Sequence, residues 1–262
     1  METVSNREWR IWEILRETFL MIKSVWKLCL PLCLLVYIPV NIIELFIPPE
    51  YSLALILLNP AETLDAGLIG DVMFFAIIIQ LIRLLFTCLV AGGYTYLALS
   101  RFSGKPVSLQ GLMDFVFSKW LALAYTGLLF YMIIIATFFL IIPAIYFAVI
   151  FVFHLNMAAV SGERGFRAMI GSARLVRGAF IKRLIYGLVF VFMQGLMTVA
   201  VGTFLIGLYP PYYAYNTIPN SIIIVSLNVL TESLASVFLL AQTVWFTNVL
   251  MSRKALGFQT GS

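Results

Sequence analysis

The sequence predicts an all-α, polytopic integral membrane protein with six transmembrane helices and amphipathic interfacial helices on its cytoplasmic side. Of the 262 residues, 62% are hydrophobic and only 11% are charged. A soluble domain has about 45–50% apolar and about 25% charged residues. The apolar residues form several separate runs, most of them long enough to cross about 30 Å of hydrocarbon, which takes roughly 20 helical residues. Lys and Arg lie almost entirely at alternate ends of these runs.

The first 24 residues are charged and amphipathic, and they predict an interfacial helix. Ser5 or Asn6 is a suitable N-cap, and apolar residues then recur at helical spacing. Trp9 and Trp12 suit the headgroup region, where amphipathic rings are favoured. An ordinary helix that packs on the protein itself explains the pattern equally well, so both interpretations remain open.

The six crossings follow in one membrane domain that covers residues 1–262. We place them at about 25–47, 70–99, 119–141, 144–160, 181–208 and 220–250. Pro31 and Pro39 lie inside the first crossing, which membrane helices tolerate when neighbouring groups satisfy the freed carbonyls. A Ser-Gly break at 103–104 precedes a short helix before the third crossing, and Pro143 marks a tight turn before the fourth. A second Ser-Gly break, at 161–162, precedes a basic surface helix over 165–180.

The charges orient these crossings. The N-terminal segment, the C-terminal segment and the loops on one side carry 16 of the 17 Lys and Arg residues. The opposite loops and adjoining helix ends carry Glu44, Glu50, Glu62, Asp65 and Asp71 but no Lys or Arg. Because loops rich in Lys and Arg stay in the cytoplasm, both termini are predicted to be cytoplasmic. Glu44, near the outer end of the first crossing, is expected to be solvated.

Two charges lie inside crossings. Arg83 is 13 residues from Gly70, and Glu232 is 12 residues from Asn220, so the two fall at similar depth. A lone charge at the bilayer centre costs at least about 2.5–3.5 kcal/mol on insertion scales, so we expect Arg83 and Glu232 to pair or to share a polar cavity. The pair either fixes the register of the helices or belongs to an ion or substrate path. His154, the only histidine, is a further candidate member of that path.

The helix predicted over 165–180 combines arginines with an apolar stripe. The basic residues in and beside it are Arg164, Arg167, Arg174, Arg177, Lys182 and Arg183. Helical periodicity places Phe166, Met169, Ala173, Val176 and Phe180 together, while Leu175 breaks the pattern. Such a helix is suited to lie half-sunk in a leaflet of anionic lipid. The alternative is that the arginines only set the topology, since any inner loop collects positive charge.

The sequence contains no pattern typical of an enzyme. No Gly-rich phosphate loop, G-x-S-x-G or H-E-x-x-H motif is present. Cys29, Cys33 and Cys88 all lie in apolar runs, and no histidine or further cysteine completes a metal site with them. We therefore expect no catalytic residue, no metal and no cofactor. The net charge of +5 is explained by topology and anionic lipid rather than by nucleic acid.

One stretch resembles a known family. The Ile-Ile-Pro-Ala turn at 141–144, the Ser-Gly break at 161–162, and Ala168, Ser172, Leu175 and Arg177-Gly178 carry the resemblance. They are similar to the YciC-like bacterial inner-membrane proteins and to the membrane domain attached to some glycerophosphodiester phosphodiesterases. This chain has Pro143-Ala144 where that family usually has Pro-Gly, and we expect no hydrolase domain within these 262 residues. The resemblance implies six helices in the bacterial cytoplasmic membrane and assigns no catalytic residue.

Three functions are compatible with these observations, and an integral-membrane enzyme acting on lipid is the least favoured because acid–base groups are so few. The first is a non-enzymatic module that organises inner-leaflet anionic lipid, a membrane protein partner or further copies of itself through its basic helices. The second is a small transporter or permease component with a polar path near Arg83, Glu232 and His154.

Overall fold

The computed structural model describes residues 8–46, 66–137, 139–208 and 218–255, and every regular element within these ranges is an α-helix. The helices are α1 (Ile11–Leu45), α3 (Ala66–Phe102), α4 (Leu109–Thr137), α5 (Ile141–Ile150), α6 (His154–Ser161), α7 (Phe166–Val176), α8 (Phe180–Leu208) and α9 (Ile218–Ala255). Six helical spans among the described residues, one formed by α5 and α6 together, are long and apolar enough to cross a membrane. The fold is therefore all-α and polytopic, as the sequence predicts.

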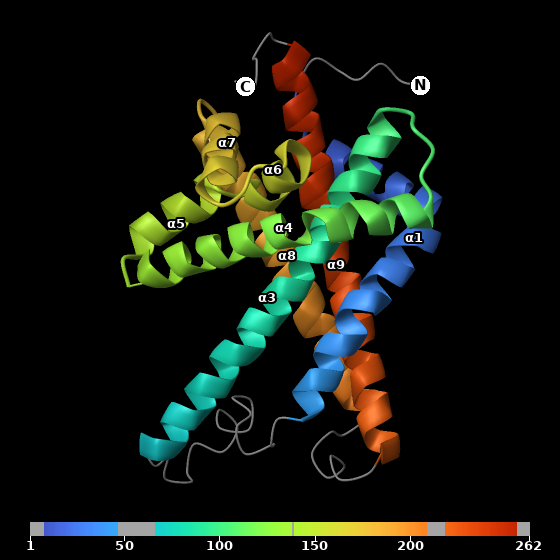
Figure 1. Ribbon diagram of the computed structural model, residues 1–262, viewed down its shortest axis with the longest axis vertical. Helices are drawn as coiled ribbons and strands as arrows, with labels where there is room; N and C mark the ends of the chain where they lie inside the picture. The colour runs from blue at the N-terminus through green and yellow to red at the C-terminus, as the bar shows by residue number, and fades with distance from the viewer. Residues whose placement is uncertain (1–7, 47–65, 138, 209–217, 256–262) are drawn as a thin grey trace.

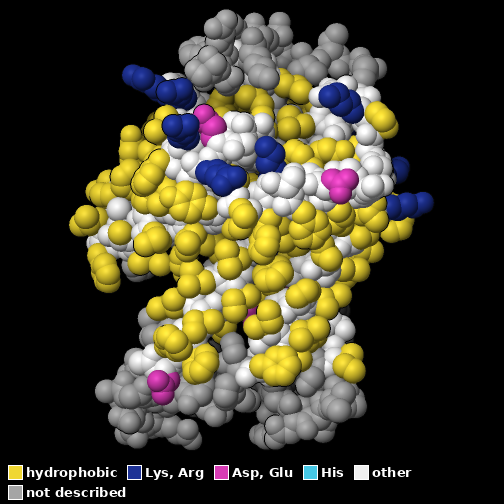
Figure 2. Space-filling model, viewed as in Figure 1, with side chains coloured by type: hydrophobic (Ala, Val, Ile, Leu, Met, Phe, Trp, Pro, Cys, Tyr) yellow, Lys and Arg dark blue, Asp and Glu magenta, His cyan; other side chains and the backbone are white. Residues whose placement is uncertain are grey.

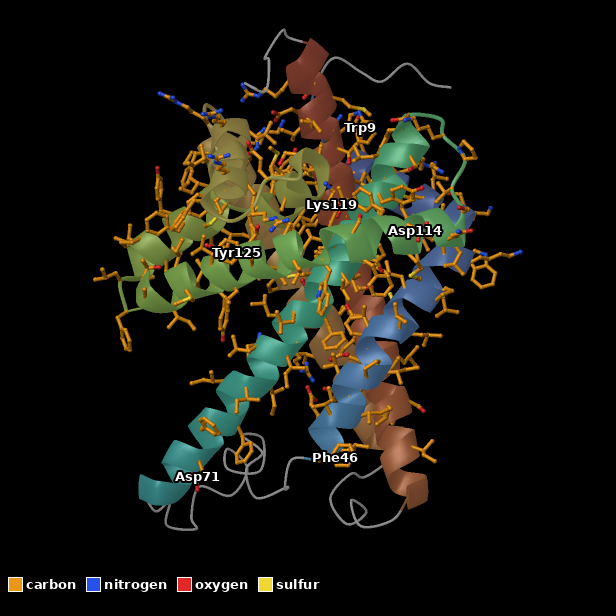
Figure 3. The ribbon with its side chains drawn as sticks, viewed as in Figure 1. Trp9, Phe46, Asp71, Asp114, Lys119 and Tyr125 are labelled. Atoms are coloured by element: carbon orange, nitrogen blue, oxygen red, sulfur yellow. The ribbon has the colours of Figure 1, made fainter. Side chains whose placement is uncertain are left out.

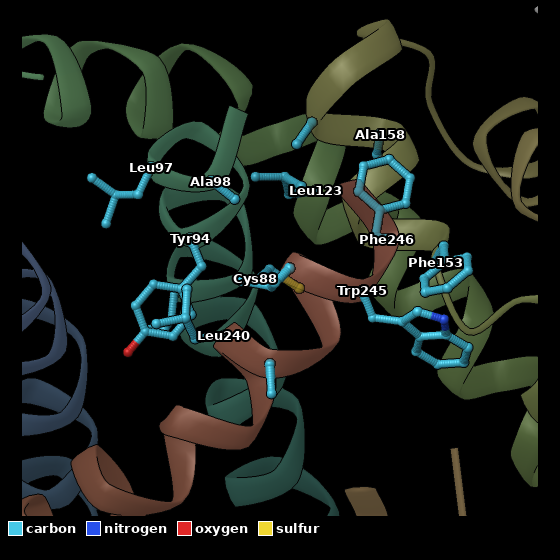
Figure 4. Packing of buried hydrophobic residues seen from close by; sticks show 14 of the residues in the cluster. Cys88, Tyr94, Leu97, Ala98, Leu123, Phe153, Ala158, Leu240, Trp245 and Phe246 are labelled. Carbon is cyan, nitrogen blue, oxygen red and sulfur yellow. The ribbon is translucent and has the colours of Figure 1, made fainter. Parts of the chain in front are cut away.

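Helix α9 is the centre of the bundle. Helices α1, α3 and α8 pack against it (Figure 1), and its apolar stretch is 67% buried whereas that of α8 is 6% buried. Figure 4 shows Leu240, Trp245 and Phe246 of α9 packed near Tyr94 of α3 and Phe153. The buried face of α9 also carries small and hydroxyl side chains, which let helices approach closely where lipid supplies no hydrophobic drive for association.

The long helices alternate between two ends of the molecule. Helix α1 begins near Trp9 and ends near Phe46, while α3 begins near Asp71 at the Phe46 end and returns (Figure 3). Helix α9 ends where α1 begins (Figure 1). Lys and Arg gather towards this end in Figure 2, and we call it the basic end. The charge bias predicted from the sequence is thus a bias between the two ends of the molecule.

Helices α4 and α5 form a hairpin that runs across the long axis of the molecule (Figure 1). Its tip is apolar, with Phe139 91% and Ile142 82% exposed. The short helix predicted before residue 119 is not separate, because α4 continues from Leu109 without a Gly-Pro or Ser-Gly break. Ser108 caps its start, and its Oγ accepts a hydrogen bond from the Gly111 amide at 3.1 Å.

The interfacial segment and the first crossing form one helix with a break. Val25, at φ −122° and ψ 15°, departs from helical geometry at the predicted boundary between the two. Pro31 and Pro39 lie inside the helix, as predicted. The predicted N-cap at Ser5 or Asn6 and the predicted outer tyrosines at 209–215 lie outside the described residues.

Both predicted Ser-Gly breaks end a helix. Gly104 and Gly162 have φ values of 67° and 70°, in the left-handed region that glycine enters without a steric penalty. Gly162 is the C-cap of α6, and its amide donates to the Ala158 carbonyl at 3.1 Å. The chain then turns into α7, which is a separate helix as predicted.

The predicted fourth crossing, 144–160, is not continuous, because residues 151–153 separate α5 from α6. Side chains from other helices satisfy the backbone groups that this interruption frees. Ser172 Oγ donates to the Ile150 carbonyl at 3.0 Å and accepts from the Phe153 amide at 3.1 Å. Gln242 Nε2 donates to the Val152 carbonyl at 2.6 Å. A broken helix is tolerated in a membrane protein when it is enclosed and paired in this way.

Candidate functional site

A cluster of charged side chains joins three helices inside the spanning region. Arg83 of α3 forms two parallel hydrogen bonds with Glu44 of α1, through Nε to Oε1 and through Nη2 to Oε2, the second at 2.7 Å. Its Nη1 lies 2.9 Å from Oε1 of Glu232 in α9. Arg83 and Glu232 therefore pair, which is one of the two arrangements expected from the sequence. The expectation that Glu44 is solvated is wrong, because Glu44 binds Arg83 through both of its carboxylate oxygens.

Asn41 completes the cluster. It lies one helical turn before Glu44 on the same face of α1, and its side chain is buried, with the residue 2% exposed. Its Nδ2 donates to Glu232 Oε2 at 2.8 Å and to the Tyr37 carbonyl at 2.9 Å. Because both partners are acceptors, the orientation of the amide is fixed. Its Oδ1 is buried and accepts no hydrogen bond from any described group.

The cluster is accessible as well as charged. The side chains of Arg83, Glu44 and Glu232 are 37%, 21% and 20% exposed. Helices α3 and α9 diverge towards the end opposite the basic end (Figure 1). With all three groups ionised, one guanidinium faces two carboxylates, so the cluster carries one surplus negative charge.

The cluster is one end of a row of polar contacts along α9. Ser236 accepts a hydrogen bond from Tyr94 of α3 at 2.7 Å and donates to the Ser233 carbonyl. Asn156 of α6 donates to Thr243 at 3.1 Å and to Thr95 of α3 at 2.9 Å. These groups are buried and are paired with one another. They hold α3, α6 and α9 together, as polar side chains commonly do between membrane helices.

His154 lies away from these contacts. Its ring stacks on Phe130, with centroids 4.1 Å apart, and its Nδ1 lies 2.7 Å from the Phe151 carbonyl. None of the contacts described for His154 is with Arg83 or Glu232. The structure therefore gives His154 a local place beside the break between α5 and α6, and it does not join the histidine to the charge cluster.

Helix α7 presents one face to the protein and another outward. Its buried residues are Ala168, Met169, Ser172, Leu175 and Val176, and they face α4, α5 and α6. Leu175, which breaks the predicted apolar stripe, belongs to this buried face. Phe166, which was predicted to share a face with Met169, is instead 59% exposed. The face that packs is set by Ser172, which is bonded to the break between α5 and α6.

The outward face of α7 mixes arginine with large apolar side chains. Arg164, Arg167, Arg174 and Arg177 are exposed, and Ile170 between them is 50% exposed. In the part of the chain that the structure describes, none of these four arginines belongs to an ion pair. The α7 basic surface, as we call these four arginines with Phe166 and Ile170, is thus charged, apolar and uncovered.

Two basic residues predicted for this surface are not part of it. Lys182 Nζ lies 2.9 Å from Oε2 of Glu8, and Arg183 Nη2 lies 2.5 Å from its Oε1. The Arg183 side chain is fully buried, so the prediction that it meets lipid is wrong. The chain just before α1 supplies the compensating carboxylate, which a basic loop alone does not reveal.

Glu8 is held as a carboxylate. Burial would raise its pKa, but the hydrogen bond from Lys182 and the positive charges of Arg183 and Lys182 outweigh burial, so the pKa lies below the ordinary value for glutamate. The neighbouring Trp9 strengthens the attachment. Its amide donates to Asn248 Oδ1 at 2.8 Å, and its carbonyl accepts from the Tyr186 hydroxyl at 3.3 Å. Residues 8 and 9 therefore clamp the start of α1 to α8 and α9.

The described residues contain no group of three or more His, Cys, Asp or Glu side chains that could hold a metal ion. Cys33 and Cys88 are buried, and Cys33 lies 3.2 Å from the Tyr94 hydroxyl. Comparisons with protein-family models, with curated proteins and with solved structures find no match to this chain.

Proposed function

We propose that this protein is a non-enzymatic membrane module that binds anionic phospholipid through the α7 basic surface, with the basic end in the cytoplasm. The observation that carries the proposal is the exposure of Phe166 and Ile170 among four arginines that form no ion pair with any residue the structure describes. Large apolar side chains are stabilised when they are removed from water, and arginine side chains are stabilised by nearby anions. The interface of an anionic leaflet supplies both at the same depth.

The inner-leaflet placement rests on the same charges. Figure 2 shows Lys and Arg concentrated towards the basic end of the face in view, and positively charged loops favour the cytoplasmic side. A bacterial cytoplasmic membrane, rich in anionic headgroups, is the setting that the sequence resemblance also implies.

Native mass spectrometry of the protein in mixed phosphatidylglycerol and phosphatidylcholine nanodiscs tests this proposal. The variant Arg164→Gln/Arg167→Gln/Arg174→Gln should lose its preference for retained phosphatidylglycerol. The matched control replaces three exposed basic residues on other segments with glutamine, namely Lys23, Lys27 and Lys105. It should keep the preference for phosphatidylglycerol. Equal retention in the arginine variant and the wild type, or equal loss in the control, would refute lipid binding at this surface.

A second candidate function is supported by the charge cluster. Arg83, Glu44 and Glu232 lie within or at the end of helices that are apolar enough to span a membrane, yet each is 20–37% exposed. Charged groups at such depth commonly line a pathway for an ion or solute. A transporter would lose flux in proteoliposomes when Glu232 becomes glutamine while remaining folded. Unchanged flux in that variant would exclude a path through the cluster.

A further inference from the structure

With Glu44 and Glu232 both ionised, the charge cluster carries a surplus negative charge that the described residues do not balance. One guanidinium, on Arg83, serves two carboxylates, on Glu44 and Glu232. In a region of low dielectric, an uncompensated charge is costly. Among the described residues, Tyr37 of α1 is the further titratable group that interacts with the cluster. Its phenol is neutral when protonated and adds no positive charge. From α3 and α9, Arg83 and Glu232 are the charged groups that face this point.

Asn41 supplies an independent observation. Its Oδ1 is buried and has no donor, while the Nδ2 of the same amide touches Glu232. Rotating the amide by 180° would direct Oδ1 at the Tyr37 carbonyl, which is an acceptor, so the orphaned oxygen cannot be an inverted amide. A donor or a cation beyond the described side chains would satisfy this oxygen, as is usual for a buried polar group.

We propose that the cluster binds one monovalent cation, held between the carboxylates of Glu44 and Glu232 and the carbonyl oxygen of Asn41. The ligand set consists of oxygens, two of them on anionic groups, and this set suits a small hard cation. One bound cation would both neutralise the cluster and give Asn41 Oδ1 a partner. The charge comes from a sodium ion or from a proton carried on a carboxyl group with a bridging water. This inference is independent of lipid binding at α7.

The variant Glu44→Gln tests the charge argument without destroying the site. The replacement has the same shape and removes the surplus charge, leaving Arg83 balanced by Glu232. The folded state therefore no longer needs the cation. The variant Glu232→Gln balances the cluster in the same way from α9. Glu17→Gln is the control, since Glu17 is a half-buried glutamate of α1 that contacts Arg16 and Arg101 rather than the cluster.

The experiment is thermal unfolding in detergent across a pH series, with sodium chloride or N-methyl-D-glucamine chloride at equal ionic strength. A rise in unfolding temperature with sodium at fixed pH, in the wild type and in Glu17→Gln but not in either cluster variant, identifies a sodium ion. A rise on lowering pH that is the same in both salts, and that is absent from the cluster variants, identifies a proton. If the wild type and the cluster variants respond alike to both sodium and pH, the proposal is wrong.

Radioactive sodium binding gives a second readout. A sodium site predicts one ion bound for each chain and loss of at least tenfold in affinity in Glu44→Gln. Arg83 is left unchanged, because its removal would leave two carboxylates without their guanidinium and would destabilise the fold itself.

Discussion

The hydroxyl of Ser172 should contribute more to the free energy of unfolding than the hydroxyl of any exposed serine. It forms hydrogen bonds with two backbone groups at the break between α5 and α6. It is fully buried, donates to the Ile150 carbonyl and accepts from the Phe153 amide. Replacing it with alanine orphans both groups in the interior. Each orphaned buried group costs about 1–3 kcal/mol. Membrane-protein measurements give about 0.6 kcal/mol on average for one interhelical hydrogen bond.

Weighing these values, we expect Ser172→Ala to destabilise the protein by about 2–4 kcal/mol, near the upper figures because two backbone groups lose their partner. For a chain of this size, 1 kcal/mol shifts the unfolding temperature by about 2–4 °C. The expected fall is therefore about 5–15 °C in a detergent melt. Hydrogen exchange at the Phe153 amide should speed up in the variant, which places the effect at the break.

Ser118→Ala is the matched control for this experiment. Ser118 is exposed on α4, and its Oγ donates only to the Phe115 carbonyl of its own helix at 2.9 Å. Its loss should cost less than about 0.5 kcal/mol, as for most surface substitutions. Equal melting temperatures for Ser172→Ala and Ser118→Ala would refute the reasoning, since the break would then be satisfied by other groups.

Three further outcomes are expected. Glu8→Gln should loosen the start of α1 in limited proteolysis. The wild type should show the same loosening at acid pH, because the lowered pKa of Glu8 makes its stabilisation complete above the ordinary glutamate value and lost as the pH falls through the folded value. Asn156→Leu should lower the unfolding temperature by about 2–8 °C, since it leaves two buried threonines without their donor at about 1–2 kcal/mol. Phe139→Cys should resist a membrane-impermeant maleimide in intact membranes, because lipid should cover the exposed hairpin tip. The control Ser103→Cys, at an exposed position outside the helices, should react in opened membranes. Fast labelling at position 139 would mean that the hairpin tip lies in water.

The helices of this fold could be read from the sequence because their determinants are local. Runs of apolar residues give their number, and the Ser-Gly pairs give two of their ends through glycines with positive φ. The break at 151–153 could not be predicted. Its residues, Phe151, Val152 and Phe153, include neither Gly nor Pro, and the side chains that satisfy it lie 19 and 90 positions away.

The sequence predicts one ion pair of the charge cluster, between Arg83 and Glu232, but not the other. Equal depth in two crossings indicated that Arg83 and Glu232 would meet, since each is costly alone. The position of Glu44 near a helix end predicts that it is solvated, although Asn41 three residues earlier is a second polar group on the same face. The bond between Glu8 and Arg183 spans 175 positions, and nothing local in either segment points to the other.

The polar groups along α9 are of two kinds, those that hold helices together and those of the candidate site. Ser236 and Thr243 are paired, neutral and buried, so helix packing accounts for them fully. The end at Glu232 differs in combining charge and partial exposure with an orphaned amide oxygen, that of Asn41. Stability alone does not require this arrangement, because apolar replacements of buried ion pairs are often neutral or stabilising. A ligand that supplies one positive charge explains all three features together, and the glutamine variants decide whether that ligand exists.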